Sequence, residues 1–169
     1  MTDESRDATR GGVNPPALPG DRGREDPLSI DELYQATIVD HDRAPRNAGA
    51  LVDPTHQATV DNPLCGDTVT LHARIVDGVI RDVAFEGRGC ALSRAAASIL
   101  TTLVRGRTAD ASRELAAAFE RFVQAPPDAA VPEELGELGA FAGVRRVRSR
   151  RVCALLGFRA LLRALDPAT

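Results

Sequence analysis

The strongest constraint on the fold is a change in the spacing of apolar residues near position 90. Between residues 69 and 85 apolar and polar side chains alternate, as in half-buried strands, and Asp77 and Gly78 interrupt the alternation. An Asp-Gly pair between two such runs is typical of a two-residue hairpin turn. Residues 91–104 then form a run rich in Ala and Leu without Pro or Gly, which predicts a buried helix. The sequence therefore predicts a hairpin that leads directly into a helix.

The remaining elements complete an α+β fold. Ser29 and Glu32 fit a capping box at the start of a helix that should end before Pro45. A short strand is expected at residues 57–60. Apolar spacing predicts later helices at about residues 110–124, 133–142 and 152–165. We therefore predict a small three-stranded antiparallel sheet packed against about four to five helices, with a core of Leu, Val, Ile and Ala.

Length and composition indicate one domain with two tails. The chain has 169 residues, and its hydrophobic fraction of 43% suffices for a core. Residues 1–27 are rich in Gly, Pro, Asp and Arg and nearly free of large apolar side chains, so we predict a disordered N-terminal tail. The domain is expected to span residues 28–165, followed by a short C-terminal tail at 166–169.

Charge and cysteine content exclude several classes of protein. The net charge of −3 and a pI near 5.6 argue against bulk nucleic-acid binding. No apolar run approaches the roughly 20 residues that span a bilayer, so no membrane association is expected. The N-terminus lacks an apolar secretion signal, and three cysteines are too few for a disulfide scaffold of this size. We expect a reducing cytoplasm, where thiols stay free.

The three cysteines and one aspartate form a candidate metal site. Cys65 and Asp67 flank a single glycine, whereas Cys90 and Cys153 lie far along the chain. Three thiolates and one carboxylate can complete a tetrahedral site for one divalent cation, most simply zinc. Four negative charges exceed the two on zinc, so the sulfurs would stay nucleophilic, and the hard carboxylate would leave most readily. Three unrelated buried thiols remain an alternative on spacing alone, because no Cys-x-x-Cys pair is present.

The predicted elements place these residues where sites are usually built. Cys90 precedes a predicted helix and Cys153 is expected in the first turn of another, where the helix macrodipole favours a thiolate. Arg150 either adds a positive charge beside Cys153 or is one more exposed arginine. The basic run at residues 145–151 fits a solvated loop, a docking site for an acidic partner or, less simply, a nucleic-acid contact. His72 alternates onto a polar strand face and is expected at the surface.

Four groups of motifs follow one another along the chain. They are Leu33-Tyr34 with Asp40-His41 and Pro45-Arg46-Asn47, then Asn62-Pro63-Leu64-Cys65-Gly66-Asp67, then Phe85-Glu86-Gly87-Arg88-Gly89-Cys90 with Ser93, and finally Arg150-Arg151-Val152-Cys153. Together they resemble the IscU/SufU family of iron–sulfur cluster assembly proteins, which is NifU N-terminal-like, over about residues 28–165. The chain is more similar to SufU, because Val152 stands where IscU-type scaffolds carry a His and because a long segment separates Cys90 from Cys153.

The resemblance implies a small sulfur-transfer domain that binds zinc. It implies that Cys65, Asp67, Cys90 and Cys153 are the metal ligands and that a cysteine desulfurase using pyridoxal phosphate (PLP) is the partner. Cys65 matches the position that accepts persulfide sulfur, and Arg150 matches an arginine of the family, so a sulfurtransferase-like role is expected for both. The sulfur would pass on to an iron–sulfur cluster assembly complex. One alternative is a scaffold that assembles a [2Fe–2S] cluster on the same residues. Another is an interaction module in which the metal only stabilises the fold.

Overall fold

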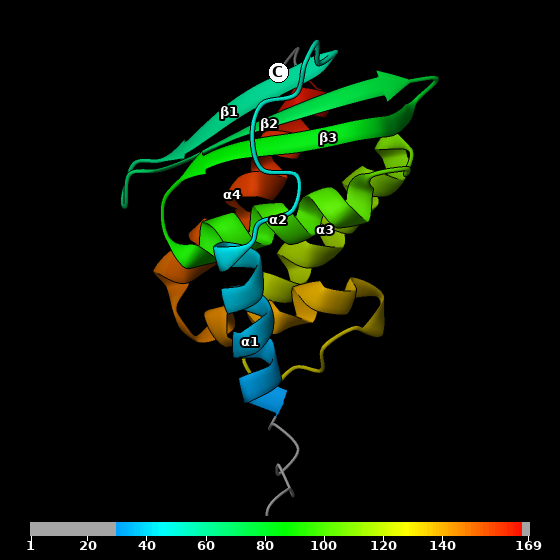
Figure 1. Ribbon diagram of the computed structural model, residues 1–169. Helices are drawn as coiled ribbons and strands as arrows, with labels where there is room; N and C mark the ends of the chain where they lie inside the picture. Colours follow the sequence, from blue (N-terminus) through cyan, green and yellow to red (C-terminus); the bar gives the residue numbers. More distant parts are fainter. Residues whose placement is uncertain (1–29, 167–169) are drawn as a thin grey trace, which may run out of the picture.

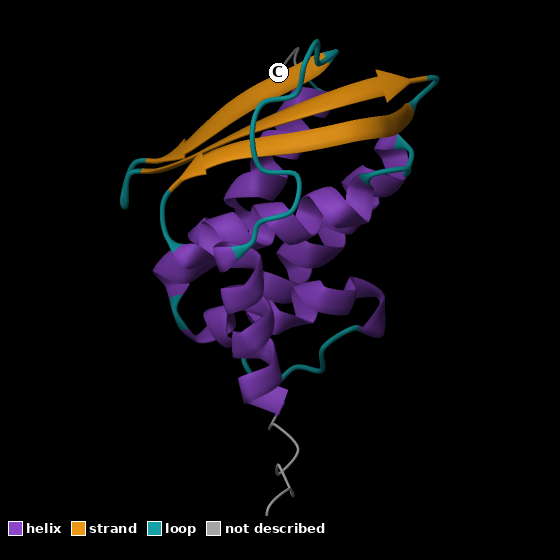
Figure 2. Ribbon diagram, in the orientation of Figure 1, coloured by secondary structure: helices purple, strands orange, loops and turns teal. Residues whose placement is uncertain are grey.

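The computed structural model describes residues 30–166 and shows a single sheet with the helices on one of its faces. Figure 1 shows the three strands side by side at the top and the helices below them. Figure 2 shows the same separation of strand and helix layers. The α+β fold class is confirmed, with three strands and five helical elements in the described range. The predicted N-terminal tail and the Ser29 cap lie outside that range.

The sheet is an antiparallel meander in chain order. Its strands are β1 (His56–Asn62), β2 (Asp67–Val76) and β3 (Val79–Arg88). The turn between β2 and β3 has positive φ at Asp77 (52°) and Gly78 (74°), as a two-residue primed turn requires. The predicted hairpin is therefore confirmed. In the neighbouring pair Asn62 lies opposite Asp67, so the β1–β2 turn lies at the same end of the sheet as the end of β3.

Five helical elements form the second layer. They are α1 (Ile30–Arg43), α2 (Ala91–Val104), α3 (Ala109–Gln124), the 3-10 segment η1 (Glu133–Arg146) and α4 (Arg148–Leu165). The first helix ends before Pro45, as predicted. A backbone kink at Gly136, with φ of 52° and ψ of −128°, divides η1 into two pieces. The structure therefore has two short helical pieces where one short helix was expected. Among the described residues, no helix is both long and apolar enough to cross a membrane.

The core is held by one close helix crossing and one aromatic cluster. A Cβ atom added at Gly157 of α4 would lie 3.2 Å from the Cα atom of Ala97, so small residues let α2 and α4 approach closely. Phe119 packs on Phe158 with 4.4 Å between ring centroids and meets Phe141 edge-on at 5.8 Å. The predicted aliphatic core is therefore only part of the interior, because these three rings fill the space among α3, η1 and α4.

The segment between α1 and β1 covers part of the other face of the sheet. It is fixed to β3 by the Gly49 amide, which donates to the Phe85 carbonyl at 2.8 Å, and to β2 by the Thr55 amide, which donates to Ala73 at 2.9 Å. His72 lies on that face, is only 5% exposed, and places its Nε2 atom 2.9 Å from Glu86. The prediction that His72 is a surface residue is wrong, because alternation identifies the face of a strand but not what covers it.

Candidate metal centre

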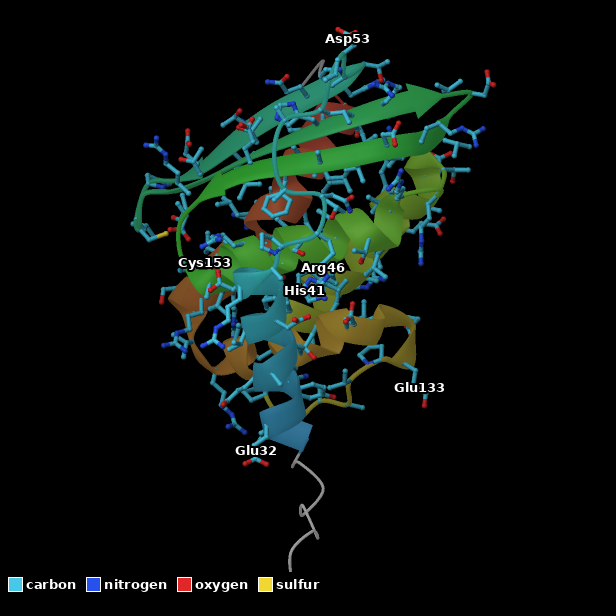
Figure 3. All side chains as sticks on the ribbon, viewed as in Figure 1. Glu32, His41, Arg46, Asp53, Glu133 and Cys153 are labelled. Carbon is cyan, nitrogen blue, oxygen red and sulfur yellow. The ribbon has the colours of Figure 1, made fainter. Side chains whose placement is uncertain are left out.

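Three segments that are distant in the chain meet at one end of the sheet. They are the β1–β2 turn, the connection from β3 to α2, and the N-terminal part of α4, all on the left of Figure 1. Cys153 is labelled on this side of the molecule in Figure 3. The Sγ atoms of Cys65 and Cys153 are 3.9 Å apart, and ligand atoms of Cys65, Asp67 and Cys153 all lie within 4.8 Å of one another. The structure thus brings three of the four predicted ligands into one compact group.

The β1–β2 turn presents Cys65 to solvent while anchoring the residues around it. The carbonyl of Asn62 accepts hydrogen bonds from the amides of Cys65 (3.3 Å) and Gly66 (2.8 Å). The side-chain oxygen of Asn62 accepts a third, from the Leu64 amide at 3.2 Å. Gly66 completes the turn with a φ of 74°, in the left-handed region that favours glycine. Cys65 is therefore exposed on a turn with a fixed backbone.

Asp67 is buried directly beneath this turn. Asp67 is only 4% exposed, and one of its carboxylate oxygens has no hydrogen-bond partner among the described residues. Burial raises the pKa of Asp67, but hydrogen bonds from the thiol and amide of Cys90 and from the Cys65 thiol outweigh it and hold that pKa below its usual range. The result is an ionised, buried carboxylate with one free oxygen, an arrangement that favours a cation.

Cys90, the fourth predicted ligand, lies at the edge of the group. It is the N-cap residue of α2, as predicted, and its thiol is exposed. Its amide and thiol both donate to the Asp67 carboxylate, and its Sγ atom lies 3.9 Å from the Ser93 hydroxyl. Cys90 thus contacts two members of the compact group, Asp67 and Cys153, without meeting all of its ligand atoms within 4.8 Å, and its role as a ligand stays a prediction.

Cys153 occupies a different helical position from the one predicted. The helix α4 begins at Arg148, four residues earlier than expected, because the amides of Arg150 and Arg151 bond back to the Val147 carbonyl. Cys153 therefore lies in the second turn, with its Sγ atom 4.0 Å from Nδ2 of Asn62 and 3.6 Å from the carbonyl of Ser149.

The electrostatic environment of Cys153 also differs from the prediction. Burial raises the pKa of Cys153 to about 12, assisted by the negative charge and hydrogen bonding of Cys90 and Cys65. The expected stabilisation of its thiolate by the helix N-terminus is therefore wrong, because that effect is confined to the first turn. A divalent cation is the kind of charge that ionises such a thiol.

Arg150 has no observed contact that would hold the thiols in place among the described residues. It is exposed and lines a hollow together with residues of α1 and η1. No hydrogen bond or ion pair joins its guanidinium to another side chain of the described part of the chain. Its assignment as a catalytic residue stays a prediction.

The Asp40-His41 and Pro45-Arg46-Asn47 motifs are structural rather than part of the metal centre. His41 is 2% exposed, and its Nδ1 atom lies 2.7 Å from the Ser98 hydroxyl on α2. The same hydroxyl accepts a hydrogen bond from the Arg46 amide at 2.8 Å, and the Arg46 guanidinium pairs with Asp40 at 2.6 Å. His41 and Arg46 lie close together at the end of α1 in Figure 3. This network fixes the chain after α1 against α2.

Sequence reasoning missed two residues that shape the site. Asn62 organises the Cys65 turn and reaches Cys153, although an Asn placed before a turn is a typical indicator of such side-chain bonding. Gly89 has a φ of 150°, and a Cβ atom there would lie 2.4 Å from the Cγ atom of Asp67. The sequence does not reveal this close contact, because Gly89 follows the end of β3 and Asp67 starts β2.

The donor set of this centre fits a divalent metal that prefers sulfur. Two thiols and one carboxylate converge, and a third thiol stands beside the carboxylate. Soft sulfur with one oxygen suits zinc or an iron–sulfur cluster better than it suits magnesium or calcium, which take oxygen ligands. The free oxygen of the buried Asp67 carboxylate agrees with a cation at this centre.

Comparisons with known proteins agree with this geometry. A family model described as the NifU-like N terminal domain matches residues 33–154. The iron–sulfur cluster assembly scaffold protein IscU of Streptococcus pyogenes serotype M1 is 35% identical over 136 residues, covering 80% of this chain and 84% of the relative. The zinc-dependent sulfurtransferase SufU of Bacillus subtilis is 33% identical over 134 residues, covering 79% and 89%.

A solved structure supports the same relationship. It is described as an iron–sulfur cluster assembly scaffold protein for the SUF system from Fervidobacterium islandicum AW-1 and superposes with a TM-score of 0.72 at 27% identity. The match covers 82% of this chain and the whole of that one. Since the family match spans most of the described residues and includes the metal centre, this chain belongs to the NifU-like N-terminal domain family of iron–sulfur cluster assembly proteins, with relatives named IscU and SufU.

Proposed function

We propose that this protein is a zinc-dependent sulfur acceptor that takes persulfide sulfur from a PLP-dependent cysteine desulfurase onto Cys65. The observation that carries the proposal is the contrast between two thiols only 3.9 Å apart. Cys65 is exposed on the tip of a turn, whereas Cys153 is 7% exposed. One thiol of the centre can therefore meet a second protein while its neighbour stays in place.

Zinc fits this centre through Cys65, Asp67, Cys90 and Cys153. When bound, zinc supplies the positive charge that keeps the cysteines as thiolates near neutral pH. Asp67 is the one oxygen donor of the set, and it is held in its ionised form by bonds from the backbone and thiol of Cys90. The buried Cys153 is held by Asn62, so its position is fixed, whereas the exposed Cys65 is free to exchange the metal for another partner.

The transfer is a thiol–disulfide type of exchange. The Cys65 thiolate attacks the outer sulfur of the donor's persulfide, a new S–S bond forms at Cys65, and the donor's own S–S bond breaks. The electron pair of that bond leaves with the donor cysteine as a thiolate, so neither an oxidant nor a reductant is consumed. The proton on the outer sulfur stays with it. The persulfide on Cys65 would then pass to an iron–sulfur cluster assembly complex.

A second candidate function is a scaffold on which a [2Fe–2S] cluster is assembled. Three cysteines and a carboxylate can hold such a cluster, and an IscU scaffold protein is among the relatives. Val152, immediately before Cys153, offers no donor atom. The metal content and visible spectrum of protein purified from its own cells separate the two functions. Zinc without colour favours transfer, and iron with visible absorption favours the scaffold.

The test of sulfur transfer compares wild-type protein with Cys65→Ala after incubation with the desulfurase and free cysteine. Intact-protein mass spectrometry should show one added sulfur atom on the wild type and none at this position in the variant. Circular dichroism serves as the control, since the exposed Cys65 side chain contributes little to the core. Undiminished sulfur uptake by the folded variant would overturn the assignment.

A further inference from the structure

The basic run at residues 145–151 is divided by the structure into two groups with different tasks. Arg145 is 3% exposed and donates to the carbonyls of Ala142 (3.1 Å) and Ala129 (2.9 Å), and its guanidinium lies 4.8 Å from the centre of the Phe122 ring. Arg151 donates to the Arg145 carbonyl. Arg145 thus joins η1 to α3 and to the loop before η1, and Arg151 joins α4 to η1. They are parts of the fold rather than a docking surface.

The other three arginines of the run point outward. Arg146, Arg148 and Arg150 are exposed, and none has an acidic partner among the described residues. The first turn of α4 contains no acidic residue. Positive side chains at a helix N-terminus face the positive end of the macrodipole and are unfavourable by about 0.3–1 kcal/mol each. Arg148 and Arg150, in the first turn of α4, therefore cost stability in the isolated chain, and an anionic partner would reverse that cost. Arg146 lies in the last turn of η1 and carries no such cost.

A groove with both apolar and polar lining, Asp31 included, runs beside these charges. It has a volume of about 490 Å³ and lies between α1, η1 and the start of α4. Arg146 and Arg150 line one side of it. Its apolar lining includes Tyr34, Ile38, Leu92 and Val144. A groove of this kind fits an apolar side chain flanked by carboxylates.

The groove and the metal centre draw residues from the same two helices, α2 and α4. Leu92 follows Cys90 by two residues at the start of α2, and Arg150 precedes Cys153 by three on α4. The turn that carries Cys65 also exposes a large apolar residue, Leu64, which is 85% exposed. A protein that reaches Cys65 would therefore approach both the groove and its basic side. These shared helices favour one partner for the two surfaces over two separate partners.

We propose that this groove binds an acidic segment, carrying an apolar side chain, of the protein that delivers sulfur to Cys65. This inference rests on the proposed function, because it identifies the occupant with the sulfur donor. The apolar lining provides the buried contact, and Arg146, Arg148 and Arg150 provide complementary charge. The arginines accelerate encounter and select the partner, while Cys65 performs the exchange.

The test uses the full chain and the PLP-dependent cysteine desulfurase encoded in the same genome. Arg146→Glu reverses one charge of the groove, and Arg81→Glu, at the far end of β3, reverses an exposed charge away from it. We expect Arg146→Glu to raise the Kd for the desulfurase about tenfold, with the difference shrinking as salt rises. At saturating desulfurase its rate of sulfur uptake should equal that of the wild type. The Arg81→Glu protein should match the wild type in both measurements.

The outcomes separate this inference from the proposed function. Wild-type sulfur uptake at Cys65 with unchanged affinity in Arg146→Glu would overturn the groove assignment alone. A wild-type chain that neither binds the desulfurase nor gains sulfur would overturn both. If Arg146→Glu abolished only self-association of the chain, seen by sedimentation, a second copy would be the occupant and the proposal would be wrong. An equal loss of affinity in Arg81→Glu would likewise contradict it, because net charge would then suffice.

Discussion

Gly89 and Asp67 are packed so closely that any side chain at position 89 would have to displace the Asp67 carboxylate. A Cβ atom there would lie 2.4 Å from the Cγ atom and 2.5 Å from an oxygen of the Asp67 carboxylate. The φ of Gly89, 150°, is in a region that L-residues rarely adopt. The absence of a side chain at one residue thus decides where a carboxylate of the neighbouring strand can lie. The position of the Asp67 carboxylate depends on the residue that follows β3 as much as on β2.

Gly89→Ala should displace Asp67 and weaken metal binding. Backbone strain should also lower the free energy of unfolding by about 1–3 kcal/mol. Gly106→Ala is the matched control, because Gly106 also has a positive φ, 83°, but an added Cβ would meet nothing within 4 Å. Competition with a coloured chelator measures zinc affinity in both. Equal affinities in the two variants would show that the contact with Asp67 does not matter for binding.

Asn62 is predicted to fix the position of the Cys65 turn relative to Cys153. In Asn62→Ala the Leu64 amide loses its acceptor and Cys153 loses a donor, so the Cys65 turn should loosen and zinc should dissociate faster. Unfolding free energy should fall by about 1–3 kcal/mol, since buried polar groups are left unpaired. Stopped-flow transfer of zinc to a chelator measures the release rate.

Asp61→Ala is the control for this prediction. Asp61 precedes Asn62 on β1 but is exposed, and among the described residues its carboxylate accepts only from the Thr68 hydroxyl, at 2.8 Å. Its removal should leave zinc release unchanged. If both variants released zinc at the wild-type rate, the turn would be held by its backbone bonds alone, and the positioning role of the Asn62 side chain would be refuted.

The stability of the metal-free protein should fall at alkaline pH because of Cys153. Its pKa is about 12 in the folded chain, against an ordinary value of 9.0 when unfolded. The thiol thus contributes stability below pH 9.0, and this contribution is lost progressively as the pH rises toward 12, because the unfolded chain gives up its proton first. Urea unfolding of chelator-treated protein measures the trend. Cys153→Ala should show a shallower decline, and an identical decline would contradict the origin in this thiol.

Much of the fold was accessible to sequence reasoning because its indicators are local. The hairpin follows from Asp77-Gly78 between alternating runs, and α2 from a run without Pro or Gly. The start of α4 was misplaced, although the hydrogen bonds that close its first turn are also local. The four residues before the predicted start of α4 are arginines and a serine, which resemble a solvated loop, yet the Val147 carbonyl closes them into a helical turn.

For the candidate site, the sequence indicated which residues take part but not the environment of each one. The three cysteines could be chosen by residue type, since the chain has no other thiols, and Asp67 by its place one glycine after Cys65. Their environment could not, because it arises from contacts between segments. The pKa of Cys153 was predicted in the wrong direction for this reason. Burial beneath the β1–β2 turn outweighs any effect of the helix end.

Ser98 is expected to be among the most sensitive polar residues of the fold. It is fully buried and bonds both the His41 ring (2.7 Å) and the Arg46 amide (2.8 Å). Ser98→Ala leaves both groups without this partner and should cost about 1–3 kcal/mol. Ser112 is equally buried but donates only to the Thr108 carbonyl near the start of its own helix, so Ser112→Ala should cost clearly less. Equal losses in thermal unfolding would argue that the link between α1 and α2 adds no stability.

Arg148→Glu should move stability and partner binding in opposite directions. Arg148 is the first residue of α4, and a carboxylate there would face the positive end of the macrodipole. The substitution should therefore increase the free energy of unfolding by about 0.3–1 kcal/mol, measured by urea denaturation of the zinc-loaded protein. If the basic residues serve a partner, the same variant should bind the cysteine desulfurase more weakly. Greater stability with unchanged affinity would mean that Arg148 lies outside the docking surface, whereas lower stability would show that an unrecognised contact holds this helix end.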